Sequence, residues 1–218
     1  MPHLPTAKAI LFDWDNTLVE TWPVIHAAMN GTLVEFGRQP WTLEETKTRV
    51  RKSMRDAFPE LFGDAWEAAG EAFYRHYSRI HLEELIVLKD ADLLLRSIQA
   101  AGVPMGVVSN KNGGFLRKEA NHLNWTPYFS KLVGATDAEN DKPALDPVML
   151  ALEPMGLSPS TDIWFVGDAD IDLACARNAG LTGILVRPEA PTTDEFDGHS
   201  PDRYCPNLSA LLAAFNEG

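Results

Sequence analysis

The stretch that decides the fold is ILFDWDNTLVET, residues 10–21. A continuous apolar run ends at Phe12 and is followed at once by Asp13 and Asp15. Apolar runs of this length are typical of buried strands. If the strand pleat continues past the run, the two carboxylates project to one side and Trp14, which stands between them, to the other. A buried strand that ends in two neighbouring carboxylates is a candidate functional site.

Apolar runs of the same kind recur along the chain and alternate with helical patterns. The predicted strands cover residues 7–12, 103–108, 132–134, 163–166 and 183–186, of which 132–134 has the weakest pattern. The predicted helices cover residues 91–101, 114–123, 146–155, 171–179 and 208–215, and residues 187–206 have the composition of a loop. Strands that alternate with helices form βαβ units. The predicted fold class is therefore α/β, a Rossmann-like doubly wound parallel sheet with helices on both faces.

The stretch from residue 20 to about residue 88 interrupts this alternation. It contains no convincing strand, and its patterns predict helices over residues 23–36, 43–57 and 65–82. We therefore expect two domains. Residues 1–19 and 87–218 would form the α/β core, and residues 20–86 would form a helical domain inserted after the first strand.

The overall composition limits the class of partner. The 218 residues carry a net charge of −12, which repels phosphate backbones and anionic lipid, so neither nucleic acid nor a membrane is expected as a partner. No apolar stretch approaches the ~18 residues that a membrane span needs, and the first residues show no signal-peptide pattern. The two cysteines, Cys175 and Cys205, are typical of a reduced, cytoplasmic protein. We expect a monomer or a homodimer.

Polar side chains follow the ends of the predicted strands. In a doubly wound sheet, ligands bind at the carboxyl ends of the strands. The polar residues found there are Asp13 and Asp15 after the first strand, Ser109 and Asn110 after the second, Lys142 beyond the third, and Asp168 and Asp172 after the fourth. We therefore expect one crevice that gathers carboxylates, a lysine and a hydroxyl group.

These residue types suit phosphoryl transfer. Clustered carboxylates repel one another, which raises a pKa or requires a cation, and a set of oxygen ligands favours Mg²⁺ over zinc. A lysine and a hydroxyl group across from them would bind a phosphoryl group, whose transfer depends mainly on positioning and charge neutralisation. Of Asp13 and Asp15, one carboxylate can attack phosphorus and bind the metal, while the other carries a proton to the leaving oxygen.

Four motifs in this order resemble the haloacid dehalogenase superfamily, in the phosphatase branch that has a helical cap. They are FDWDNT (12–17), VVSN (107–110), DKP (141–143) and VGDADID (166–172). The helical insertion lies between the first two motifs, where this branch carries its cap domain. The resemblance spans nearly the whole chain. It departs from the common pattern at Asn16, where Gly is frequent, and at Ala169, where Ser or Thr is frequent.

The resemblance implies catalytic and metal-binding roles for four aspartates. Asp13 would be the nucleophile, would form an aspartyl-phosphate and would bind Mg²⁺. Asp15 would act as general acid and then as base, and its backbone carbonyl would bind Mg²⁺. Asp168 would be a direct ligand of Mg²⁺, whereas Asp172 would act through a water molecule or by supporting the direct ligands.

The resemblance also implies a phosphate-binding set. Ser109, the backbone N–H of Asn110 and the ammonium group of Lys142 would hold the phosphoryl oxygens. Thr17 would help to fix the loop that carries the aspartates. Lys111, next to the second motif, would either contact the substrate or face solvent.

The leading functional hypothesis is a Mg²⁺-dependent phosphatase for a small phosphorylated metabolite, similar to phosphoglycolate phosphatase. A phosphomutase similar to β-phosphoglucomutase would use the same residues and return the phosphoryl group to a sugar. The dehalogenase reaction is disfavoured because that branch needs neither a metal nor a proton-carrying second aspartate. A receiver-like phosphoacceptor domain gathers similar groups in a different order, and a non-catalytic binding protein on this fold is a further alternative.

Residues of the expected cap are candidates for substrate selection. Lys47, Arg51 and Arg55 have i, i+4 spacing and would share one face of a basic helix. That face would either grip an anionic group of the substrate or be solvated. Trp22 and His26 follow the catalytic loop closely and would either line the cleft or pack in the protein interior.

Overall fold

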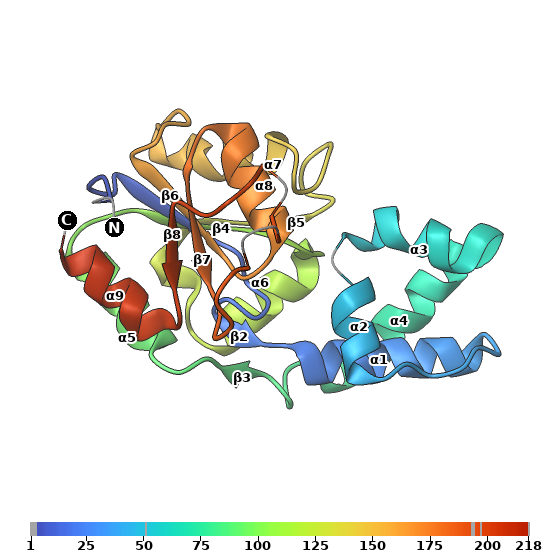
Figure 1. Cartoon of the computed structure of the whole chain (residues 1–218). Coiled ribbons are helices and arrows are strands. Elements are labelled where there is room, and N and C mark those ends of the chain that lie inside the picture. Colours follow the sequence, from blue (N-terminus) through green and yellow to red (C-terminus); the bar gives the residue numbers. More distant parts are fainter. Residues whose placement is uncertain (1–3, 51, 193–194, 197, 218) are drawn as a thin grey trace. The chain divides into compact units, whose positions relative to one another are not determined.

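The structure is a computed structural model that describes residues 4–50, 52–192, 195–196 and 198–217 (Figure 1). The chain divides into two compact units. Residues 1–19 and 87–218 form one unit, and residues 20–86 form the other. Within the described part of the chain, no helix combines the length and the apolar character that crossing a lipid bilayer requires.

The first unit is built on a six-stranded sheet in the order β5-β4-β1-β6-β7-β8. Its strands are β1 Ala9–Phe12, β4 Met105–Asn112, β5 Phe129–Ala135, β6 Ile163–Gly167, β7 Thr182–Val186 and β8 Arg203–Cys205. Every neighbouring pair is parallel. The strand β1 is 0–1% exposed along its whole length, because it is flanked on both edges and covered on both faces. This burial explains why its sequence is continuously apolar.

Helices cover both faces of this sheet (Figure 1). They are α5 Ala91–Ala100, α6 Gly113–His122, α7 Asp146–Leu152, α8 Asp170–Ala179 and α9 Leu208–Asn216. One core cluster joins α7 and α8 to the sheet through apolar side chains such as Leu152 and Cys175 packed with Leu11 and Phe165. The predicted α/β fold class, a doubly wound parallel sheet, is confirmed.

The strand order places the reversal of the chain at β1. From β1 the chain moves to β4 and β5 on one side, and it then returns to β6, β7 and β8 on the other side. At such a switch point the loops beyond the carboxyl ends of neighbouring strands separate and leave room for a ligand. The loops that follow β1, β4 and β6 therefore meet at one edge of the sheet.

The second unit contains the helices α1 Trp22–Glu35, α2 Leu43–Arg49, α3 Met54–Phe62 and α4 Trp66–Ile80. Thr42 begins α2 with a capping box, since its side chain accepts the N–H of Glu45 while the Glu45 carboxylate accepts the N–H of Thr42. The helices pack through an aromatic cluster whose adjacent ring centroids lie 5.1–5.8 Å apart. The cluster comprises Phe36, Phe58, Phe62, Phe73 and Tyr77.

Three sequence predictions about individual elements are wrong. A single helix over residues 43–57 does not form, because α2 ends at Arg49 and α3 begins at Met54. Ser53, which precedes α3, has an extended backbone, and its hydroxyl donates to the Asp56 carboxylate at 3.0 Å. The predicted loop over residues 187–206 contains β8. The insertion, predicted to be helical throughout, is bounded by two short paired strands, β2 Val19–Glu20 and β3 Ile86–Val87.

Gly134 in β5 allows a close approach between this strand and the start of α6. A Cβ atom at residue 134 would overlap Cα and N of Gly113 and the carbonyl oxygen of Lys111. These atoms belong to the backbone and cannot rotate away, so Gly134→Ala is expected to lower the free energy of unfolding by about 3 kcal/mol. Urea titration monitored by circular dichroism would measure the change, and a loss under about 0.5 kcal/mol would contradict this packing.

Candidate active site

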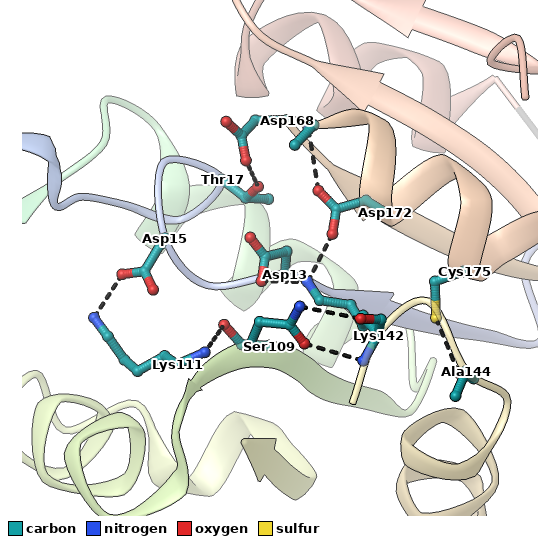
Figure 2. A network of polar contacts seen from close by, with 12 residues as sticks. Asp13, Asp15, Thr17, Ser109, Lys111, Lys142, Ala144, Asp168, Asp172 and Cys175 are labelled. Atoms are coloured by element: carbon teal, nitrogen blue, oxygen red, sulfur yellow. Dashed lines mark hydrogen bonds and ion pairs between the residues drawn. The ribbon is translucent and has the colours of Figure 1, made fainter. Parts of the chain in front are cut away.

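Asp13 lies directly beyond the carboxyl end of β1, at the centre of the switch point. Its N–H donates to the carbonyl of Val166 at 2.8 Å, so the backbone ladder continues one residue past the strand. The side chain is mostly buried, and its Oδ1 accepts a hydrogen bond from Lys142 Nζ at 2.8 Å (Figure 2). The backbone and the lysine together hold this carboxylate in one place.

A tight loop follows Asp13 and returns the chain through Asn16. Asn16 has a φ of +59°, in the left-handed region that Asn tolerates better than most residues. Its N–H donates to the carbonyl of Val19 at 2.6 Å, which closes the loop. Thr17 is fully buried, and its hydroxyl lies 3.4 Å from Asp168 Oδ1. The loop thus connects the end of β1 to the end of β6.

Lys142 is the cationic centre of the site. Its Nζ donates to Asp13 Oδ1 at 2.8 Å and to Asp172 Oδ1 at 2.7 Å, and its side chain is 2% exposed (Figure 2). The side-chain amide of Asn110 holds the lysine backbone from both sides: Nδ2 donates to the Lys142 carbonyl at 3.2 Å, and Oδ1 accepts the Lys142 N–H at 3.0 Å. Asn110 therefore fixes the point from which the lysine reaches the acids.

Three carboxylates form a cluster that could hold a metal ion. One oxygen from each of Asp13, Asp168 and Asp172 lies within 4.8 Å of the other two. Asp172, in the first turn of α8, is further held by the N–H of Ala169, which donates to its Oδ2 at 3.1 Å. The donors are all carboxylate oxygens, which suit a hard cation such as Mg²⁺.

The electrostatics of the cluster also favour a bound cation. Burial, together with the charges of Asp172 and Asp13, raises the pKa of Asp168 well above its usual value. Burial likewise raises the pKa of Asp172 to about 6, although Lys142 opposes the rise. One lysine thus leaves the negative charge of this cluster incompletely balanced, and a divalent cation would stabilise the ionised acids.

Ser109 lies near the end of β4 and is buried. Its Oγ accepts the N–H of Lys111 at 3.3 Å (Figure 2). The hydroxyl proton can therefore point elsewhere, which leaves it able to donate to a phosphoryl oxygen. Asp170, in contrast, is exposed on α8.

Lys111 has a position in this site that its place in the sequence does not indicate. Of the two alternatives offered for it, exposure to solvent is wrong, and contact with substrate stays a prediction. Its side chain is 5% exposed, and Nζ lies 2.5 Å from Asp15 Oδ1 and 2.9 Å from Glu119 Oε2. The signal in the sequence was Glu119, a charged residue on the apolar face of the predicted helix over residues 114–123.

The residues proposed for substrate selection lie in the helical unit. Lys47 belongs to α2 and Arg55 to α3, so the predicted common helix face does not exist, and Arg51 lies outside the described residues. Trp22 is partly buried at the start of α1. His26 interacts within its own unit, with Nδ1 at 2.9 Å from Thr46 Oγ1 and Nε2 at 3.3 Å from Asn30 Nδ2. These contacts agree with the packing alternative for His26, and lining of the cleft stays a prediction.

Comparison with known proteins agrees with this geometry. Residues 10–186 match the family described as haloacid dehalogenase-like hydrolase, and the chain belongs to this family. Phosphoglycolate phosphatase of Escherichia coli K12 is 28% identical over 235 residues, which cover 95% of this chain and 92% of that protein. A protein of Clostridium perfringens that is provisionally named pyrophosphatase PpaX is 28% identical over 201 residues, which cover 90% of this chain and 92% of that protein.

A solved structure shows the same fold. A hydrolase of the haloacid dehalogenase-like family from Streptococcus pneumoniae superposes with a TM-score of 0.84 at 21% identity, over 96% of this chain and 99% of that protein. The predicted assignment to the haloacid dehalogenase superfamily, in its phosphatase branch, is thereby confirmed.

Proposed function

We propose that this protein is a Mg²⁺-dependent phosphatase that hydrolyses a small phosphomonoester metabolite. The observation that supports this function best is the position of Asp13, which is paired with Lys142 on one side and clustered with Asp168 and Asp172 on the other. A nucleophilic carboxylate between a cation and a metal-binding set is what transfer of a dianionic phosphoryl group requires.

The proposed reaction has two steps that share Asp15. In the first, Asp13 attacks phosphorus, the bond from phosphorus to the ester oxygen breaks, and Asp15 protonates the leaving oxygen. The product of this step is an alcohol and an aspartyl-phosphate on Asp13. In the second, Asp15 takes a proton from a water molecule that attacks the phosphorus, which releases inorganic phosphate and restores Asp13.

Other side chains hold the phosphoryl group during both steps. Lys142 neutralises charge on Asp13 and on the phosphoryl oxygens, and its two ion pairs fix its direction. The Ser109 hydroxyl and the backbone N–H of Asn110 would donate hydrogen bonds to the same oxygens. Because these groups are held before substrate arrives, little reorganisation is needed during the reaction.

Mg²⁺ would be held by Asp13, Asp168 and the backbone carbonyl of Asp15, with Asp172 acting through a water molecule or in support of these ligands. When bound, it would neutralise the charge of the phosphoryl group and orient it for in-line attack. Thr17, which lies 3.4 Å from Asp168, would keep that aspartate directed toward the ion.

The proposed substrate class is tested by a panel of phosphorylated compounds with the purified protein. The panel includes phosphoglycolate and pyrophosphate, which correspond to the names of the two relatives, and β-glucose 1-phosphate for the mutase alternative. We expect release of inorganic phosphate with Mg²⁺ and its loss with EDTA. Isomerised sugar phosphate without phosphate release would favour a mutase, and no reaction with any compound would contradict the proposal.

The metal site predicts a thermal shift that does not depend on activity. A Mg²⁺ concentration about ten times the Kd stabilises the folded state by about 1.4 kcal/mol, which raises Tm by about 3–6 °C for a chain of this size. Asp168→Asn is expected to abolish the rise, whereas Asp170→Asn, a change at the exposed neighbour, is expected to keep it. Differential scanning fluorimetry measures the shift, and an equal rise in both variants would place the ion elsewhere.

A further inference from the structure

We propose that Lys111 is a positioning residue that holds the carboxylate of Asp15 in place for proton transfer. This inference rests on the proposed function, because it assigns Lys111 a role in the reaction described above. Lys111 follows Ser109 by two residues on β4 (Figure 2). Its Nζ donates a charge-assisted hydrogen bond to Asp15 Oδ1 at 2.5 Å.

Lys111 is itself held by a second buried acid. Glu119, on α6, is 0% exposed, and its Oε2 accepts a hydrogen bond from Lys111 Nζ at 2.9 Å. The same oxygen accepts the indole N–H of Trp14 at 2.8 Å. Glu119 therefore holds the ammonium group through a second contact, in addition to its contact with Asp15.

Trp14 closes these contacts into a ring. Its side chain is fully buried and packs edge-on against Trp125 and Phe129, with centroid distances of 5.8 and 6.4 Å. Trp14 is also the chain neighbour of Asp15. The Asp15 side chain is thus tied through Lys111 and Glu119 to the residue that precedes it, which restricts both the loop and the rotamer of the carboxylate.

The two lysines of the site serve different carboxylates. Lys142 contacts Asp13 and Asp172, whereas Lys111 contacts Asp15 and Glu119. Lys142 therefore faces the proposed nucleophile and Lys111 the proposed proton carrier. Burial of a lysine with two acids costs desolvation free energy unless the ion pairs are well formed. The position of Lys111 beside the proposed proton carrier therefore favours a functional explanation.

Loss of this positioning has a characteristic kinetic signature. A general acid must lie within hydrogen-bond reach of the leaving oxygen, and it contributes about 10²–10⁴-fold where protonation is needed. An alkoxide is a poor leaving group and needs the proton, whereas p-nitrophenolate leaves readily without it. A displaced Asp15 should therefore slow the cleavage of alkyl phosphates much more than the cleavage of p-nitrophenyl phosphate.

The experiment compares kcat/KM for an alkyl phosphate and for p-nitrophenyl phosphate in matched variants. Lys111→Met keeps the length of the side chain and removes its charge, and Lys111→Arg restores a cation. Lys118→Met makes the same change at an exposed lysine of α6. We expect Lys111→Met to lose about 100-fold on the alkyl ester and under about 5-fold on the aryl ester. Lys111→Arg should recover part of the loss, and Lys118→Met should match the unchanged protein on both esters.

Equal losses of Lys111→Met on the two esters, or no loss on either, would overturn the positioning role. If this variant does not fold, as judged by circular dichroism, Glu119→Gln replaces it, because it removes a charge without changing the volume. Glu119→Gln should also lose more kcat/KM on the alkyl ester than on the aryl ester, and equal losses on the two esters would again overturn the role. Absence of phosphate release from every compound of the panel would refute the proposed function and this role together, whereas equal losses in an active protein refute this role alone.

Discussion

Replacement of Asp13 by asparagine is expected to lower kcat for any phosphate ester by about 10⁴-fold or more, because an amide oxygen cannot form the covalent intermediate. The fold should survive, since the substitution preserves volume and the Asp13 N–H still donates to Val166. Steady-state release of phosphate measures the effect, with circular dichroism to verify the fold.

The matched control for this result is Asp170→Asn. Asp170 lies on α8 near the carboxylate cluster but is exposed. It is neither the proposed nucleophile nor a member of the cluster that could hold a metal ion. We expect its kcat to change by less than about 2-fold, as is common for surface substitutions. Retention of more than a tenth of the activity in Asp13→Asn would show that phosphorus is attacked by another group.

Gly167→Ala is expected to cause the second largest effect. Gly167 ends β6, and a Cβ atom there would overlap Cβ, Cγ and Oδ2 of Asp172. Asp172 would have to move from Lys142, which would lose one of its two ion pairs. A displacement of about 1 Å at a catalytic centre can cost about 10²-fold in rate, and overpacking adds about 1–3 kcal/mol of destabilisation.

Gly183→Ala is the matched control for Gly167→Ala. Gly183 lies on the adjacent strand β7, paired with Phe165, and a Cβ atom there would lie 3.3 Å from Leu173 Cδ2 and 3.4 Å from Ala176 Cβ. Leu173 Cδ2 can yield by a few tenths of an ångström, and the distance to Ala176 Cβ is an ordinary van der Waals contact. We expect kcat within about 2-fold of the unchanged protein. A Gly167→Ala protein with full activity would mean that Asp172 does not need its present position.

The sequence predicted the parts of the fold in which one physical cause dominates. β1 and β6 are buried on both faces, so their sequences are continuously apolar and both strands were found. The proximity of Ser109, Lys142 and Asp172 followed from the rule that loops at the carboxyl ends of parallel strands meet at a switch point. The polar residues could be found because they interrupt apolar runs near the strand ends.

The remaining features depend on short or long-range contacts that leave little pattern. β8 has three residues at the edge of the sheet, too few for a periodic signal. The break between α2 and α3 lies at the extended residue Ser53, inside a stretch whose periodicity is helical. The contact of Trp14 with Glu119 joins residues 105 positions apart. No spacing in the sequence could indicate that Lys111 lies between Glu119 and Asp15.

The paired strands β2 and β3 have an evolutionary consequence. Residues 20–86 leave and rejoin the chain at neighbouring points, since β2 pairs with β3 and the N–H of Leu88 donates to the carbonyl of Leu18 at 3.1 Å. An insertion with adjoining ends can be lengthened, shortened or grafted from a relative without altering the order of the six-stranded sheet. The acid cluster beyond the ends of the sheet strands can therefore stay unchanged while the inserted residues vary.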